Sequence, residues 1–518
     1  MSAKRIAIFN PDNPSVGNAV VGARFIGRLT VNNRPINRAP TKLERSNELS
    51  EFNQGPGKQH GAALLVMLVI LVVGIAAILV NSLTASSVKT ARQATTAAAL
   101  AQAKDALIGY AITYADTHTS SPQVDGYLPC PDLSGTSGAT GEGSADTCGS
   151  KDVSSIGRLP WKTLDLEPLR DGDGECLWYV VSGTYKNNPN TDMMNWDTQG
   201  LLQVSDANAN TVSDVVAVIF APGSTLSGQD RSASGTAPIC GGNYTASNYL
   251  DSDGTHNNSA VSGTASAASS YYSGTSSQMN DRLIYITRQD IWNAMLKRSD
   301  FMTTLTNMTQ QVASCIAWYG SNNYNNDNYS LPWPAPLSLS DYTSDNSYSD
   351  SSGLYVGRIP YYVHTSNNTT KNNMYGDYLL PSTIQSGTCL GWSTTYYAWW
   401  TNWKDHLFYA ISKEYRPIPY YYDTNNCGAC VQVSGLKYAA VVMFAGQTLT
   451  GQSRSDKSQL IAYLEGLNYS SYPNSGGNNS YQGGVTTSTF NDILFCIKEP
   501  SSHTLTAVPY DTALGRCP

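Results

Sequence analysis

KQHGAALLVMLVILVVGIAAILVNSL, residues Lys58–Leu83, is an apolar stretch that begins more than fifty residues into a chain of 518. From Ala62 to Val80 no side chain is polar, and nineteen helical residues at about 1.5 Å each span the roughly 30 Å hydrocarbon core of a bilayer. A secretory signal has a shorter apolar region followed by a cleavage site, whereas here Asn81 leads into more helix. The stretch therefore predicts a membrane-spanning helix at residues 62–80.

Charges and cysteines indicate which way this helix crosses. Residues 1–60 hold nine Lys or Arg and four acids, and basic residues ahead of an apolar run keep that end in the cytoplasm. All ten cysteines follow the run, as expected for a chain exported into an oxidising space. Charged residues make up only 14% of the chain, with a net charge of -7, so nothing favours nucleic acid as a partner.

The helical pattern continues beyond the apolar run. The next residues are rich in Ala, without Gly until Gly109 and without Pro until Pro122, which predicts one helix from residue 62 to about residue 117. Apolar residues such as Leu100, Leu107 and Ala111 recur at helical spacing in its second half. We expect that face to be buried against something.

This beginning resembles type IV pilins and type II secretion pseudopilins, whose basic leader ends in Gly before a hydrophobic helix. The matching residues are Lys58, Gly61 as the last leader residue, and Ala62 as an N-methylated first mature residue. The resemblance implies cleavage by prepilin peptidase, an inner-membrane stage with the N-terminus cytoplasmic, and packing with other pilin or pseudopilin subunits. It extends to about Lys186 through the segments LPW, PLRDGDGE and LWYVVSG.

Two departures from the family pattern indicate a minor subunit. Major subunits usually begin with Phe and carry Glu at the fifth mature position, where this chain has Ala62 and Val66. The leader, residues 1–61, is also long for the family, which either a misplaced start codon or a real cytoplasmic extension explains. The alternative is an uncleaved single-pass anchor that holds an adhesin-like protein for a surface ligand.

The remainder of the chain is a tandem duplication. Six segments recur in the same order with offsets of about 200 to 230 residues. They are YLPCP and SLPWP, GRLPW and GRIPY, CLWYVVSGTY and HLFYAISKEY, DVVAVIFAPGSTLSGQDRS and YAAVVMFAGQTLTGQSRS, YLDS and YLEG, and NDRLIYIT and NDILFCIK. We therefore expect a first head at residues 119–287 and a second head at residues 288–518, whose own helix would cover Arg288–Gly320.

Each head contains one strand that is apolar throughout, Val215–Ala221 or Ala439–Ala445, which predicts a central strand buried on both faces. A glycine-rich loop with the same four residue types follows each strand. Its arginine is expected to hold the loop by capping carbonyls, with ligand binding as the alternative. The loop residues are Gly228, Gln229, Arg231 and Ser232 in the first head and Gly451, Gln452, Arg454 and Ser455 in the second.

The duplication also predicts disulfides, because cysteines that are absent together from the other copy were plausibly bonded together. This favours Cys130–Cys148 and Cys176–Cys240. Cys496 and Cys517 would close a loop similar to the C-terminal disulfide loop of type IV pilins. Cys315–Cys389 and Cys427–Cys430 are left by elimination, and CGAC at 427–430 lacks the βαβ context of a redox enzyme and a second pair at zinc-ligand spacing.

No catalytic motif emerges from the sequence, and we expect no enzyme. The six histidines are scattered, and neither a GxSxG elbow nor a GxxxxGK phosphate loop is present. Alternating oxygen side chains suggest weak calcium sites, and pseudopilins sometimes hold calcium, but acidic turns explain the same strings without metal. The candidates are Asp171, Asp173 and Glu175, and Asp251 with Asp253. The expected fold is α+β, with a long N-terminal membrane and assembly helix before two pilin-like heads with antiparallel sheets.

Overall fold

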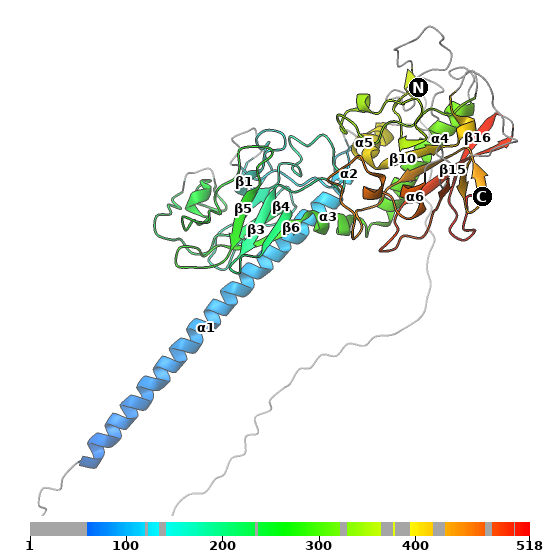
Figure 1. Cartoon of the computed structure of the whole chain (residues 1–518). Helices are drawn as coiled ribbons and strands as arrows, with labels where there is room; N and C mark the ends of the chain where they lie inside the picture. The colour runs from blue at the N-terminus through cyan, green and yellow to red at the C-terminus, as the bar shows by residue number, and fades with distance from the viewer. Residues whose placement is uncertain are drawn as a thin grey trace, which may run out of the picture. The chain divides into compact units, whose positions relative to one another are not determined.

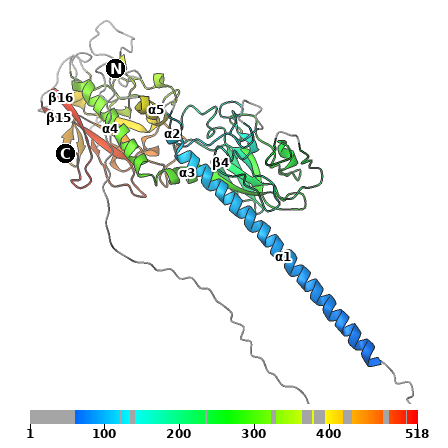
Figure 2. The same cartoon turned by 180° about the vertical axis from the view of Figure 1, so that it is seen from behind.

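The computed structural model describes residues 60–119, 123–133, 141–233, 237–321, 329–363, 377–378, 394–417, 430–471, 479–501 and 503–518. Side chains are described from Ser86 onward, except at 377–378 and 394–395. The chain divides into two compact units, Met1–Ala77 and Ile78–Pro518. Both predicted heads fall in the second unit, shown from two sides in Figures 1 and 2.

The first element is the helix α1, His60–Ile112, followed by the short α2, Tyr114–Thr117. Leu100, Ala103, Leu107 and Ala111 are buried along one side of α1, at the spacing that the sequence predicted. The predicted membrane segment 62–80 lies among residues whose side chains are not described, so it stays a prediction. Within the described part of the chain, no helix is both long and apolar enough to cross a bilayer.

The first head contains a six-stranded sheet. β4 lies at its centre, with β2 and β3 along one side and β6 along the other, and all pairings are antiparallel except the parallel pair β3–β5. The strands are β1 Ser155–Arg158, β2 Trp178–Val181, β3 Leu202–Asp206, β4 Thr211–Ala221, β5 Ser269–Ser273 and β6 Arg282–Thr287. A short helix η1, Ala246–Asn248, lies between β4 and β5.

The second head repeats this plan. Its main sheet has the order β16-β15-β13-β10-β7, all antiparallel, so β7, β10, β13 and β15 correspond to β1, β2, β4 and β6. These strands are β7 Val356–Arg358, β10 Leu407–Ile411, β13 Ala440–Phe444, β15 Ile493–Ser501 and β16 Thr504–Pro509. The expected α+β class with antiparallel sheets is confirmed, and equal strand order supports the duplication.

Smaller elements complete the second head. β11 Val431–Val433, β12 Leu436–Tyr438 and β14 Ser480–Tyr481 form one sheet, and β8 Tyr362–Val363 pairs with β9 Asp377–Tyr378. The helices are α5 Thr394–Trp403 and α6 Leu467–Ser470. Single 3₁₀ turns are η2 Asp345–Ser347, η3 Lys404–His406, η4 Lys413–Tyr415 and η6 Leu460–Ala462.

The helix predicted at Arg288–Gly320 is two helices, α3 Arg288–Met295 and α4 Ser299–Ser321, so the prediction of one helix was wrong. A capping box between Thr287 and Asp290 begins α3 directly after β6. The chain turns before α4, where the Arg298 guanidinium donates to the carbonyl of Ile112 at the end of α1. This contact binds the turn to the first head, and α4 then crosses β16, β15 and β13 (Figure 2).

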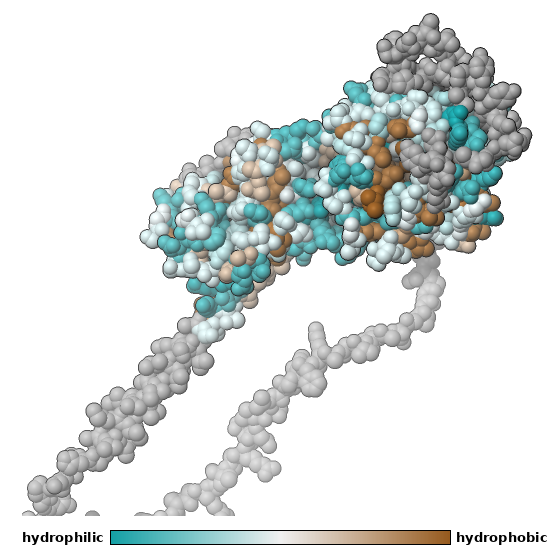
Figure 3. Space-filling view, viewed as in Figure 1, coloured by the Kyte–Doolittle hydropathy of each residue, from teal (hydrophilic) through white to brown (hydrophobic). Residues whose placement is uncertain are grey.

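The central strands are buried on both faces, as predicted. Residues of β4 from Val215 to Ala221 and all of β13 are buried. One apolar core contains the helix-facing sides of both sheets, α4 and the buried side of α1, while each sheet has a smaller core on its other face. A space-filling view shows a mostly polar surface with a few apolar areas (Figure 3). The heads therefore share one continuous interior.

Three of the predicted disulfides are present: Cys130–Cys148, Cys176–Cys240 and Cys496–Cys517. Cys315 and Cys430 are disulfide-bonded as well. Cys389 and Cys427 lie outside the described residues, so the pairings Cys315–Cys389 and Cys427–Cys430 stay predictions.

Truncation of a buried residue in α1 should destabilise the unit Ile78–Pro518. Leu107 is fully buried in the shared core, so Leu107→Ala is expected to lower the free energy of unfolding by about 2–5 kcal/mol through lost burial and a residual cavity. Val88, on the same helix, is 47% exposed, and Val88→Ala should change it by less than about 0.5 kcal/mol. Urea unfolding measures both, and equal losses would contradict the packing of α1.

Candidate functional site

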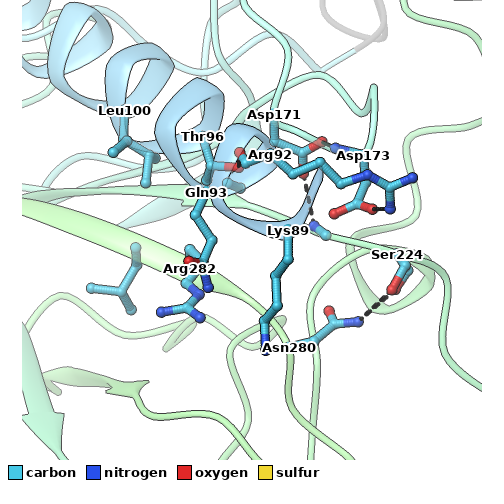
Figure 4. Close-up of a pocket in the computed structure, with 14 residues that line it drawn as sticks. Lys89, Arg92, Gln93, Thr96, Leu100, Asp171, Asp173, Ser224, Asn280 and Arg282 are labelled. Atoms are coloured by element: carbon cyan, nitrogen blue, oxygen red, sulfur yellow. Dashed lines mark hydrogen bonds and ion pairs between the residues drawn. The ribbon is translucent and has the colours of Figure 1, made fainter. Parts of the chain in front are cut away.

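A groove of about 520 Å³ lies in the first head between α1 and the start of β6. Lys89, Gln93 and Leu100 line it from α1, and Arg282 and Leu283 line it from β6 (Figure 4). The loop after β4 and the turn that carries Asp171 complete its wall. The groove thus lies between α1 and the outer edge of β6.

The predicted calcium string DGDGE is the turn that fits against α1. Asp171 Oδ1 accepts the backbone N–H groups of Asp173 (2.9 Å) and Glu175 (3.0 Å), and its Oδ2 accepts that of Gly223 (2.8 Å). Gly172 donates to Thr96 Oγ1 at 2.9 Å, and a Cβ on this glycine would lie 2.2 Å from a backbone oxygen of α1. The turn therefore needs glycine for a close helix contact.

The cations around the groove differ in their pairing. Arg92 forms an ion pair with Asp173 at 3.0 Å, and Figure 4 shows it turned toward that carboxylate. Glu175 pairs with Arg231 at 3.2 Å. Lys89 and Arg282, both exposed, make no ion pair and no side-chain hydrogen bond with any described residue. Two positive charges are thus left on one groove.

The repeated loop acts through the same contacts in both heads. The Oε1 of Gln229 accepts Leu226 N and that of Gln452 accepts Leu449 N, both at 2.9 Å. Arg231 donates to the carbonyls of Asn248 and Gly223, and Arg454 donates to those of Ala462 and Gly446. The glycines Gly228 and Gly451 have φ of 93° and 94°, a conformation that favours glycine. These contacts support the expectation that the arginine holds the loop.

Each loop also leads to a pair of buried carboxyl groups. Gln229 donates to Asp251, whose Oδ2 accepts the N–H groups of Asn280 and Asp281, while Asp281 Oδ2 accepts Asp251 N at 2.7 Å. Burial, and next the charge of Asp251, raises the pKa of Asp281 to about 8.

The second head contains the same pair at equivalent positions. Glu465 N donates to Asp492 Oδ2 at 3.0 Å, and Gln452 donates to Glu465 Oε1 at 2.8 Å. Burial and the charge of Glu465 raise the pKa of Asp492 well above its ordinary value. The sequence pairs YLDS with NDRL, and YLEG with NDIL, were therefore marks of a buried carboxyl pair in each head, in which burial and the neighbouring acid favour the protonated form of one aspartate.

The second calcium candidate, DSDG, is divided between two structures. Asp251 belongs to the carboxyl pair, whereas Asp253 accepts the backbone N–H groups of Thr255 and His256 and forms an ion pair with the His256 ring at 3.1 Å. The backbone of His256 is the main cause that lowers the pKa of Asp253 to about 2. Among the described residues, no three His, Cys, Asp or Glu side chains are grouped to hold a metal ion.

A charge cluster between the heads was missed from the sequence. Arg454 Nη1 contacts both carboxylate oxygens of Asp197 at 2.9 Å, and both side chains are buried. His406 Nδ1 lies 2.8 Å from Asp405 Oδ1, and Trp196 Nε1 donates to His406 Nε2 at 2.7 Å. Asp197 and Trp196 belong to the first head and the other residues to the second, so the repeated arginine of the second loop also joins the heads.

Three neighbouring contacts extend this junction. Met194 N donates to Asn402 Oδ1 at 2.7 Å, and Asn195 Nδ2 donates to the Asn402 carbonyl at 2.8 Å. Lys457 forms an ion pair with Asp405 at 2.8 Å. The only available signal was position 406, where His replaces the disulfide cysteine of the first head.

The remaining site residues of the sequence prediction are Gly61 and Ala62. Both lie in the first turn of α1, in the part whose side chains are not described, so their role in processing stays a prediction.

Removal of the bridging arginine should cost more than removal of its counterpart. Arg454→Met leaves the buried Asp197 without its bidentate partner and is expected to lower the free energy of unfolding by about 3–5 kcal/mol. Arg231→Met should cost less, because its partner Glu175 is 27% exposed and reaches water. Chemical unfolding tests the order, and an equal or reversed order would argue against the charge cluster.

The carboxyl pairs predict a pH dependence of stability. Folded Asp281 keeps its proton up to a pH of about 8, whereas an unfolded Asp releases it near 3.8, so the folded state binds more protons between these values. Stability should therefore fall as pH rises from about 4 to about 8, and level off above. The double variant Asp281→Asn, Asp492→Asn should lose most of this slope in thermal unfolding, and an unchanged slope would refute the protonated form of these aspartates.

Comparison with known proteins found no match for this chain among protein families, curated proteins or solved structures. The likeness to pilins accordingly rests on the residues quoted from Lys58 to Lys186.

Proposed function

We propose that this chain is a minor pilin-like or pseudopilin-like subunit that acts in the assembly, tip or surface contacts of a type IV pilus or type II secretion filament. The subunit is inserted in a bacterial inner membrane with its N-terminus cytoplasmic. Prepilin peptidase cleaves between Gly61 and Ala62, and the heads then work by contact with other subunits. Its work is assembly rather than catalysis.

The observation that carries the proposal is the helix α1. It has 53 residues, begins at His60 beside the proposed cleavage bond, and ends in the core of the first head at Ala111 and Ile112. Among the residues of α1 whose side chains are described, burial begins at Ala99 and Leu100. The apolar sequence of residues 62–80, ahead of this buried part, fits a helix that enters first a membrane and then a filament core.

The duplicated heads support a minor role. Two sheets, two helices and a shared core give a far bulkier exported unit than one pilin-like head. A bulky unit is hard to repeat in a closely packed helical lattice, which favours the tip or the initiating position.

Charge distribution fits partners that are proteins. Removal of residues 1–61 takes away nine basic and four acidic residues and leaves 23 basic and 35 acidic ones, a net charge of -12. A chain this acidic repels nucleic acid and steers toward basic or mixed protein surfaces.

The proposal is tested by the processing of the leader in host cells with and without prepilin peptidase. We expect the intact mass to correspond to a methylated chain from Ala62 only when the peptidase is present. Gly61→Val should block this cleavage because the resemblance makes Gly61 the last leader residue. The same substitution four residues earlier, Gly57→Val, is the matched control and should leave processing intact.

A chain that keeps residues 1–61 in both strains would overturn the assembly proposal. It would then favour the membrane-tethered protein with a surface ligand, which needs no cleavage. Cleavage at another bond, insensitive to Gly61→Val, would equally count against the pilin-like assignment.

A further inference from the structure

The two heads differ at one sheet edge. In the second head, β15 pairs with β13 on one side and with β16 on the other. Its counterpart β6 pairs with β4 and with no other described strand. The chain passes from β6 directly into α3, so the first head has no segment of its own at the position of β16. The second head thus shows that an antiparallel strand fits at the edge that β6 leaves open.

The second head also identifies the backbone groups that face outward. Tyr510 N donates to Leu494 O at 3.0 Å, and the register pairs Cys496 with Val508. Leu494 and Cys496 correspond to Leu283 and Tyr285, because Asn491 and Asn280 begin the matched segments. In the first head, the carbonyl oxygen of Tyr285 accepts a hydrogen bond from Lys104 Nζ at 3.0 Å. Lys104 therefore occupies a position that a strand N–H takes in the second head.

The groove continues this edge at the start of β6. Arg282 is the first residue of β6, and it faces the groove together with Lys89 on α1 (Figure 4). Neither cation has an ionic partner among the described residues, and the apolar side chains of Leu100 and Leu283 lie beside them. An extended segment along β6 would bring its C-terminal end to these charges, since β16 runs antiparallel to β15.

We propose that the outer edge of β6 and the adjoining groove bind an extended segment of another protein chain. The segment adds one antiparallel strand to the first head and places an acidic side chain at its C-terminal end between Arg282 and Lys89. Main-chain hydrogen bonds supply affinity, and the two cations fix register and direction. This surface is separate from the cleavage bond, so its test does not depend on processing of the leader.

The charge pattern favours this occupant over further pairing between identical heads. Exposed strand edges are commonly protected by short length and by lysine, and β6 has six residues with Lys104 at its middle. Protection alone accounts for Lys104, but it leaves the groove and the two unpaired cations beyond the strand unexplained. An added strand with an acidic end accounts for the edge beside Lys104, for the groove and for the two unpaired cations.

The chain itself supplies a probe. A labelled peptide with the sequence of Thr504–Asp511, TLTAVPYD, copies β16 and ends in an acid that the register places opposite Arg282. Added to the full-length protein in detergent, it should bind and slow hydrogen exchange at the amides of Leu283 and Tyr285. A peptide N-methylated at the position of Tyr510, whose N–H faces β15 in the second head, should bind about tenfold more weakly. N-methylation at Ala507, whose N–H faces away, is the matched control.

Protein variants test the cationic end. Arg282→Glu should weaken binding of the peptide about tenfold, while Arg282→Lys and the distant Lys413→Glu, at an equally exposed site, should leave it unchanged. No protection of β6 amides at high peptide concentration would overturn the proposal. Equal binding of the two N-methylated peptides would also overturn it, because strand addition needs the N–H of Tyr510. Equal binding by Arg282→Glu and Arg282→Lys would overturn it as well, because charge pairing at this edge predicts a difference.

Discussion

The burial of β4 and β13 on both faces is the constraint on which the rest of each head depends. A strand that is apolar on both sides must be covered twice. Helices α1 and α4 cover one side. The other side is covered by the segment with Tyr249 and Leu250 in the first head, and by the segment with Tyr463 together with residues of β11, β12 and β14 in the second. Loops contribute few regular hydrogen bonds, so they must be held by other means. The repeated glutamine and arginine perform this task by satisfying loop N–H and carbonyl groups, and the paired carboxyl groups tie the loop to the start of the next strand.

The two heads secure the same loop differently, and the difference joins them. In the first head, Cys176 at the start of β2 is bonded to Cys240 in the loop. In the second head the equivalent position is His406, which contacts Asp405 and Trp196, while Arg454 reaches Asp197. A covalent link within one copy is thus replaced by a buried charge cluster between copies. Loss of one partner from such a cluster leaves a buried charge uncompensated, so the junction resists separation of the heads. Replacement of the whole cluster by apolar residues of similar volume costs little by comparison.

Sequence reasoning went furthest where the duplication supplied a second copy. Matched segments located β4 and β13, and the joint absence of cysteines identified Cys130–Cys148 and Cys176–Cys240. The role of Arg231 and Arg454 in loop holding followed from chemistry alone. For the contacts between copies the only signal was His406 in place of Cys176, because the residues around Asp197 have no matched segment. The break before α4 was missed, and the contact found there, between Arg298 and the carbonyl of Ile112, joins residues that are 186 apart in sequence. The sequence left weak calcium sites and acidic turns as alternatives, because it does not show that an acid such as Asp171 accepts backbone N–H groups.

Divergence between copies is most informative at the sheet edge. After duplication, both heads inherited a central strand, a covering helix and a loop clasp, and each of these needs its residues for stability. The strand β16 and its disulfide Cys496–Cys517 stabilise one edge of the second head alone. In the first head no described strand pairs with the outer edge of β6, although an open edge risks unwanted pairing. Lys104 limits that risk by holding the Tyr285 carbonyl, yet it is paired with Asp290 at 3.1 Å and can keep this partner if a strand displaces it. An edge that is covered by a side chain with a second partner is suited to reversible pairing, because opening it leaves no buried charge alone.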